Sequence, residues 1–341
     1  MSFKIPLMTP IRPTPERDTP ISPRENLMLA LNHQKPLWMP NLYADSQCVL
    51  SKCNRDTAPR KDADGYDWFG TYYKYSPVQF SNTPTAGVFK EIGEWRDKVK
   101  WPDLNAIDWT ADLEGFVRDE RLALYTRMSN GPFERLHFFE GFEQALMDIF
   151  VEPEECRAFF ERYVDHRIEV FNHMRDVFPF DYIVAADDYS TARAPFFSTE
   201  LYEKILLEPT RRFVKAVQAR GTKFIAHCCG MIDVFIPYFA DLGVDGLEIQ
   251  SMNDISSIYE KYGDKLTVEY ATDKYVVFDP ENDEAALRQH VRDIVDQYGA
   301  HKVNGAGVVM NIGADTDERY FPMEDELYNY SRKLYTASEN T

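Results

Sequence analysis

The chain has 341 residues, of which 44% are hydrophobic and 14% aromatic, which is enough for a large core. Its formal net charge of −18 makes nucleic acid or an anionic membrane surface a poor partner. No apolar run approaches the roughly 20 residues that span a bilayer, and the first residues lack the apolar core of a signal peptide. Five cysteines in so long a chain do not form a disulfide framework, so we expect a cytoplasmic protein.

The N-terminal segment is rich in proline, with six in residues 1–23. Proline fixes φ and lacks a backbone N–H, so we predict an irregular arm over residues 1–21. Such an arm can cover the body or a second subunit, which leaves a homodimer open. The sequence Ser-Pro-Arg-Glu at 22–25 is typical of a helix start. Residues 37–43 are predicted to form the first strand, with Asp45 at its tip.

Residues 46–105 show no clean periodicity and are rich in Tyr, Trp, Asp and Gly. A long excursion inside a compact domain is either a lid or a small subdomain. Its aromatic side chains could stack on a flat ligand or pack the excursion against the rest of the domain. Both readings stay open from the sequence.

The remainder alternates between apolar runs and helical patterns. Strands are predicted at 122–126, 182–187, 223–228, 246–250 and 266–270, with helices between them and a last helix at about 284–298. This alternation predicts one α/β domain over residues 22–341, a closed (β/α)8 TIM barrel. A doubly wound open sheet is the alternative, but no phosphate loop or GxGxxG motif follows any strand.

Polar side chains gather where the predicted strands end, which is where parallel sheets place reactive groups. His227 and Cys229 are two residues apart on a strand and therefore share a face. Imidazole and thiolate on one face are suitable ligands for Zn²⁺. A buried cysteine is also commonly a small hydrophobe, so both readings remain. Cys228 is expected to face the helices.

Carboxylates follow the same pattern. Asp187 and Asp188 are neighbours that face opposite ways, so one should enter the pocket. Glu248 and Glu269 lie on later strands and could each supply a third metal ligand, a base or a structural acceptor. Buried acids are costly, so an inward acid needs a metal, a proton to move or a cationic ligand. With Asn304, these groups are predicted to converge at one barrel mouth.

The order of these pieces resembles the uroporphyrinogen decarboxylase-like superfamily, which contains the decarboxylases and corrinoid-linked methyltransferases. The resemblance covers roughly residues 22–335 and implies a (β/α)8 barrel with its site at the carboxyl-end mouth. The pieces that carry it are the helix start at 23–33, Gly-Pro-Phe at 131–133, Glu-Gly-Phe-Glu at 140–143, Asp-Asp-Tyr-Ser-Thr at 187–191, Pro-Phe-Phe-Ser at 195–198, and His-Cys-Cys-Gly at 227–230 with the segment 236–245.

Two departures indicate the branch. The decarboxylases carry an arginine-rich segment after the first strand, whereas residues 40–47 here contain no arginine. The methyltransferases hold zinc with a His-x-Cys pair and a later cysteine; His227 and Cys229 match the pair, but residues 305–313 contain no cysteine. The resemblance then favours an O-demethylase type, which moves a methyl group from an aryl methyl ether to cob(I)alamin on a separate corrinoid protein.

This reading assigns roles to the residues that match the family. A zinc ion would need a carboxylate as third ligand, from Glu269, Glu248 or Asp187. A tetrapyrrole decarboxylase, a lyase of this barrel type and an inactive binding subunit remain as alternatives. The expected catalytic residues are Asp187, Asp188, His227, Glu248 and Glu269; the expected metal ligands are His227, Cys229 and Glu269; and the expected substrate-binding residues are Asp45, Asn130, Phe139, Tyr189 and Asn304.

Overall fold

The computed structural model describes residues 17–56, 64–76, 81–84, 87–271, 276–277, 279–303, 305–312 and 318–337. The helices are α1 (Pro23–Leu31), α2 (Trp95–Lys98), α3 (Pro132–Glu140), α4 (Phe142–Val151), α5 (Pro153–Val177), α6 (Thr199–Ile205), α7 (Leu207–Gln218), α8 (Ile236–Leu242), α9 (Ile255–Tyr262), α11 (Glu284–Tyr298) and α12 (Tyr320–Ala337). The strands are β1 (Ser46–Cys48), β2 (Gly65–Tyr66), β3 (Tyr72–Ser76), β4 (Ser81–Pro84), β5 (Ala123–Met128), β6 (Tyr182–Ala186), β7 (Lys223–Cys228), β8 (Gly246–Ile249), β9 (Thr267–Ala271) and β10 (Val309–Asn311).

The main sheet is parallel and curled, with strand order β1-β5-β6-β7-β8-β9-β10. Its two ends are joined by one stretch of backbone, because the segment just before β1 is bonded to β10. Leu42 N donates to Met310 O at 2.8 Å, and Met310 N donates to Pro40 O at 2.8 Å. The fold is therefore TIM-barrel-like, but the described residues form seven strands in this sheet where the sequence predicted eight.

The first strand lies later than predicted. Residues 37–43 contribute only an isolated bridge at Asn41, and the strand proper is β1. Pro40 has no N–H to give to a ladder. A turn then follows, in which Asp45 N donates to Asn41 O at 2.8 Å. Asp45 consequently precedes β1 and lies at its amino end, not at a strand tip on the carboxyl side.

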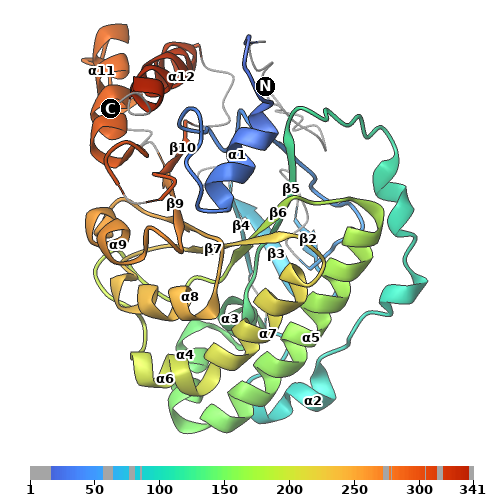
Figure 1. Cartoon of the computed structure of the whole chain (residues 1–341). Coiled ribbons are helices and arrows are strands. Elements are labelled where there is room, and N and C mark those ends of the chain that lie inside the picture. The colour runs from blue at the N-terminus through green and yellow to red at the C-terminus, as the bar shows by residue number, and fades with distance from the viewer. Residues whose placement is uncertain are drawn as a thin grey trace.

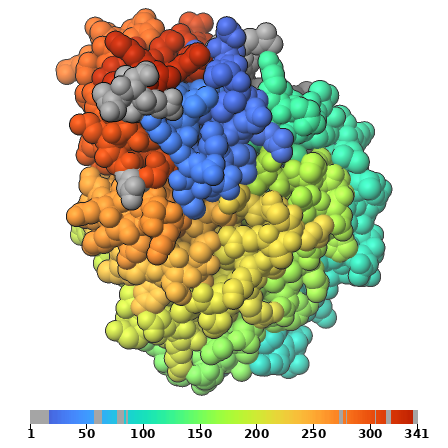
Figure 2. All heavy atoms as spheres, in the orientation of Figure 1, coloured from blue at the N-terminus to red at the C-terminus, as the bar shows by residue number. Residues whose placement is uncertain are grey.

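The alternation of side chains along the strands separates two cores. Tyr182, Val184 and Ile225 lie in the barrel interior with Leu27 and Leu31 of α1. The intervening residues, such as Ile183, Phe224 and Leu247, pack against the outer helices. Arg24 N of α1 donates to Arg121 O, just before β5, at 2.8 Å, so α1 covers the amino ends of the strands. Figure 1 shows α1 at one end of the molecule and α4 and α6 at the other. In Figure 2 the blue segment around α1 fills the surface beside the orange-red C-terminal helices.

The excursion between β1 and β5 is a docked subdomain. It contains an antiparallel sheet of order β2-β3-β4, α2 and short 3-10 turns. Arg135 of α3, which is fully buried, forms ion pairs with Asp56 at 3.1 Å and with Asp67 at 2.5 Å. The aromatic ring of Phe69 packs on that of Phe139 with centroids 5.3 Å apart. Of the two readings from the sequence, the described part of the excursion fits packing rather than an open aromatic platform.

Most of the predicted proline-rich arm lies outside the described residues. Within the described part, Arg17 forms an ion pair with Asp325 of α12 at 2.9 Å. The helix start at Ser22 is confirmed: its hydroxyl accepts from Glu25 N at 3.1 Å, and Pro23 is the first helical residue. None of the described helices is both long and apolar enough to cross a membrane.

Gly131 is required by a close approach between β6 and α3. A Cβ at this position would lie 2.1 Å from Asp187 Cβ, although its φ of −64° suits any residue. We predict that Gly131→Ala lowers the free energy of unfolding by about 1–3 kcal/mol, measured by urea denaturation. The control is Gly93→Ala, where no atom lies within 4 Å. It should be neutral or stabilising by up to about 1 kcal/mol. Equal effects of the two substitutions would contradict this account.

Candidate active site

The predicted polar residues of three neighbouring strands share one level of the sheet. His227 of β7 is in register with Glu248 of β8, and Glu248 with Glu269 of β9. Partners in parallel strands point to the same side, and Ile225, two residues before His227, lies in the barrel interior. These three side chains therefore project into the interior near the carboxyl ends of their strands.

His227, Cys229 and Asp188 form the tightest group of possible metal ligands among the described residues. One ligand atom from each lies within 4.8 Å of the other two. His227 Nε2 is 3.3 Å from Cys229 Sγ and 3.7 Å from Asp188 Oδ1. Nitrogen, sulfur and oxygen donors in this number suit Zn²⁺ with a fourth position open. The structure thus brings Asp188 to the predicted His227–Cys229 pair, where the sequence reading had put Glu269.

The two neighbouring aspartates have different surroundings. Asp188 accepts a hydrogen bond from Cys229 N at 2.7 Å and is part of the mouth. Asp187 points the other way, accepting from Phe133 N at 3.2 Å and Glu134 N at 3.0 Å at the start of α3. Burial raises the pKa of Asp187 to about 7, although these backbone bonds oppose the rise. Asp187 is therefore placed as a cap of α3 rather than as a group in the mouth.

A buried chain of charges orients His227. Its Nδ1 lies 3.1 Å from Glu248 Oε1, as an ion pair rather than a well-aligned hydrogen bond. Arg127 of β5 holds both oxygens of Glu248, at 2.8 and 3.0 Å. Burial opposes ionisation of Glu248, but His227 and Arg127 outweigh it and lower its pKa to about 2. Burial likewise lowers the pKa of His227, but the contacts with Cys229 and Glu248 raise it to about 10.

Glu269 is a buried acid of the same group. Burial, and then the charge of Glu248, raise its pKa well above the usual value, which favours its protonated form. One oxygen contacts the side-chain amide of Asn311, and the other is buried without a hydrogen-bond partner among the described residues. An acid whose protonated form is favoured, beside an ionised one, is the arrangement that separates acid and base roles.

The residues expected to bind substrate lie elsewhere. Asn130 is buried, has a left-handed φ of 58° and donates from its side chain to Asp56 O at 2.7 Å. Phe139 is fully buried among aromatic rings, and Tyr189 packs between Phe197 and Phe235. Asp45 lies at the opposite end of the strands, and Asn304 is outside the described residues. Contact with a substrate at the mouth is therefore not supported for the four that can be placed.

Sequence reasoning missed Arg127 and Asn311. Arg127 interrupts the apolar run of β5 one residue before its end. A charge in such a strand is expensive unless it is paired, so this position could have been recognised as the partner of an inward acid. Asn311 gave no comparable signal, because a single polar residue near the end of a strand is common.

The Arg127–Glu248 pair gives a prediction about stability. Arg127→Met leaves Glu248 ionised, buried and short of a counter-charge, so we expect a loss of about 3 kcal/mol in the free energy of unfolding. Adding Glu248→Gln should recover most of that loss. As a control, Arg212→Met removes a surface pair with Asp165 and should cost less than about 1 kcal/mol. Urea denaturation of the four proteins measures these values, and an Arg127→Met effect as small as the control would count against the buried chain.

Comparison with known proteins agrees with this fold. The chain resembles in fold a methyltransferase from Methanosarcina mazei, with a TM-score of 0.66 and 10% sequence identity, over 90% of this chain and 98% of that one. No curated protein matches in sequence. The model of the uroporphyrinogen decarboxylase (URO-D) family matches residues 128–318, which is more than half of the chain. The matched range starts one residue after Arg127 and includes His227, Glu248 and Glu269. The chain therefore belongs to the uroporphyrinogen decarboxylase (URO-D) family.

Proposed function

We propose that this protein is a methyltransferase that moves a methyl group from a methoxylated aromatic compound, or a similar small donor, to cob(I)alamin on a corrinoid protein. The observation that carries the proposal is a group of possible zinc ligands beside a buried acid. Asp188, His227 and Cys229 suit zinc, and burial favours the protonated form of Glu269. The fold likeness to a methyltransferase supports the same class.

In this proposal Asp188, His227 and Cys229 would hold a zinc ion, which would supply Lewis-acid chemistry at the ether oxygen. Glu248, fixed by Arg127, orients the His227 ring so that Nε2 faces Cys229. A carboxylate behind a ligating histidine is the usual arrangement for fixing the ring and its tautomer.

The proton balance assigns a role to Glu269. When a methyl group leaves an aryl ether as a cation equivalent, the oxygen keeps the bonding electrons and needs a proton. The cobalt centre of the partner supplies the electron pair that forms the new carbon–cobalt bond. Glu269, whose protonated form is favoured by burial, is the acid of the group that we assign to give this proton. Arg127 is engaged by both oxygens of Glu248 and is therefore not free to bind the carboxylates of a porphyrinogen.

Exposed apolar side chains indicate where the corrinoid protein docks. Among the described residues, four large exposed hydrophobic side chains lie on α4: Phe142, Met147, Phe150 and Val151. Helix α4 follows β5 and packs on α3, on the side where the strands end (Figure 1). Val234 and Met252, also exposed, follow the carboxyl ends of β7 and β8. Apolar groups around a reactive mouth suit a partner that must reach into it.

The reaction is tested with cob(I)alamin and a panel of guaiacol-type ethers, methylamines and methanol, with methylcobalamin followed by absorbance. We expect turnover with the aryl ethers and bound zinc in the same preparation. Cys229→Ser or His227→Ala should reduce the rate by about 100-fold or more and lower the zinc content. Cys228→Ala is the matched control, because Cys228 belongs to the outer core. Absence of transfer with every donor, in folded protein, would overturn the proposal.

Docking is tested separately with the double variant Met147→Ser, Phe150→Ser. These side chains are exposed, so the fold should be kept, whereas the KM for the corrinoid protein should rise about tenfold or more. Transfer to free cob(I)alamin should be unchanged. Val117→Ser, an equally exposed apolar residue in the segment leading into β5, should change neither value. An unchanged KM in the α4 variant would remove α4 from the docking surface while leaving the reaction intact.

A further inference from the structure

A small cavity lies behind the strand ends that carry the candidate active site. Its volume is about 40 Å³, and its walls come from β6 and β7, the start of α3, and the helices α5, α7 and α8. All residues that line it belong to the described part of the chain. Many of the lining side chains are apolar, but Arg167, Asp187 and Thr210 bring polar groups to the wall. The cavity therefore differs from purely apolar ones, which stay dry.

Arg167 of α5 contributes an unused hydrogen-bond donor. The residue is 1% exposed. Its Nη1 donates to Asn130 O at 2.8 Å and its Nη2 to Met128 O at 2.7 Å, which fixes the guanidinium against the end of β5. Its Nε is buried and has no hydrogen-bond partner among the described residues. A buried N–H that donates to nothing is costly, and more so on a charged group, so this donor calls for an acceptor.

The carboxyl group of Asp187 offers an acceptor on the same cavity. One of its oxygens accepts from Phe133 N at 3.2 Å and the other from Glu134 N at 3.0 Å, and each oxygen can accept a second bond. Burial raises the pKa of Asp187 to about 7, while the two backbone bonds and the charge of Arg167 oppose the rise. Arg167 and Asp187, both within the described residues, form no direct ion pair with each other. A connection between them therefore needs a bridging molecule.

Water is the molecule that fits this space. A buried water needs at least about 10–15 Å³ and two to four polar partners, so the cavity has room for about two. Arg167 supplies a donor, Asp187 supplies acceptors, and the Thr210 hydroxyl can do either. We infer that this cavity binds about two water molecules, and that they join Arg167 Nε to the carboxyl group of Asp187.

The bridge makes Arg167 a positioning residue for the strand ends. The Asp187 carboxyl caps α3, and Asp187 N donates to His227 O at 3.1 Å. Water held by Arg167 fixes this carboxyl from the side of the helices, and with it the junction of β6, β7 and α3. The inference concerns the support behind the site and does not depend on the proposed methyl transfer.

A high-resolution crystal structure of the full chain tests the water directly. We expect ordered water within hydrogen-bond distance of both Arg167 Nε and the Asp187 carboxyl. Crystals kept under xenon pressure should show the same water and no xenon there, because xenon enters dry apolar cavities. Xenon in the cavity, or a cavity without ordered water, would overturn the inference.

Nuclear magnetic resonance tests the bridge in solution. The Nε–H of Arg167, identified by its loss in Arg167→Lys, should show a direct contact with water. The indole N–H of Trp109 is the control, because it is also buried and donates to Leu104 O at 3.0 Å. It should show no such contact. Equal water contacts at the two groups, or none at Arg167, would count against the bound water.

The positioning role is tested by amide hydrogen exchange. Arg167→Lys keeps the positive charge and removes the Nε donor, so exchange at the Glu134 amide should become about tenfold faster or more. Exchange at Val291, buried in α11, should not change, which separates a local effect from general destabilisation. Arg157→Lys, in an exposed pair with Glu161, is the matched control and should change neither rate.

Unchanged exchange at Glu134 in folded Arg167→Lys would overturn the positioning role. If Arg167→Lys does not fold, the crystal structure and the water contacts of the unmodified protein still decide whether the cavity holds water.

Discussion

The candidate site depends on one physical constraint: ionised groups inside a barrel must compensate one another. Glu248 is ionised because Arg127 holds both of its oxygens and His227 lies beside it. Burial, and then that negative charge, raise the pKa of Glu269 one strand away. The buried Arg127–Glu248 pair thus fixes a negative charge beside the histidine ring and disfavours a second one on Glu269. In water each of these interactions would be screened, so the same groups in solution would not be held in this arrangement of charges.

The register of the short strands of the sheet places these charged groups next to one another. Register between β7, β8 and β9 brings His227, Glu248 and Glu269 to one level, and a slip of one residue would turn each of them out of the interior. The excursion after β1 is fixed in a comparable way. Arg135 is buried between Asp56 and Asp67, and its guanidinium lies over the Phe69 ring at 4.9 Å. Phe69 of the excursion therefore packs against the wall of the barrel and is not free to stack on a ligand.

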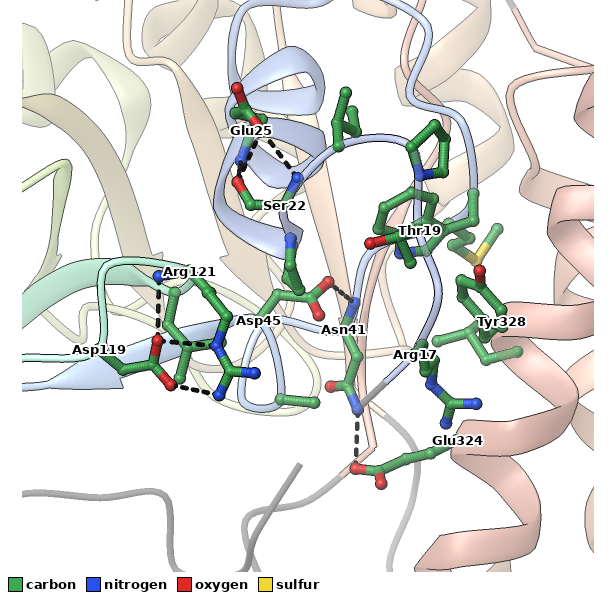
Figure 3. Close-up of a pocket in the computed structure, with 18 residues that line it drawn as sticks. Arg17, Thr19, Ser22, Glu25, Asn41, Asp45, Asp119, Arg121, Glu324 and Tyr328 are labelled. Atoms are coloured by element: carbon green, nitrogen blue, oxygen red, sulfur yellow. Dashed lines mark hydrogen bonds and ion pairs between the residues drawn. The ribbon is translucent and has the colours of Figure 1, made fainter. Parts of the chain in front are cut away.

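The acidic side chains at the two ends of the barrel have different hydrogen-bond and ion-pair partners. At the carboxyl ends, Glu248 is matched by Arg127 and His227, and Glu269 contacts Asn311. At the amino ends, Asn41 donates hydrogen bonds to both Asp45 and Glu324 (Figure 3).

The sequence by itself determined the fold class and the family, and it predicted that polar side chains gather where the strands end. Alternating apolar runs and helical patterns predict a parallel α/β fold, and the spacing of His227 and Cys229 puts them on one face because strand side chains alternate. The sequence could not place Asp45, since its position depends on a turn that starts after Pro40 and delays the first strand. It could not choose between Asp187 and Asp188, because that choice depends on α3 approaching β6 at Gly131. Nor could it identify Arg127 as the partner of Glu248, because 121 residues separate them along the chain and only the closure of the sheet brings them together.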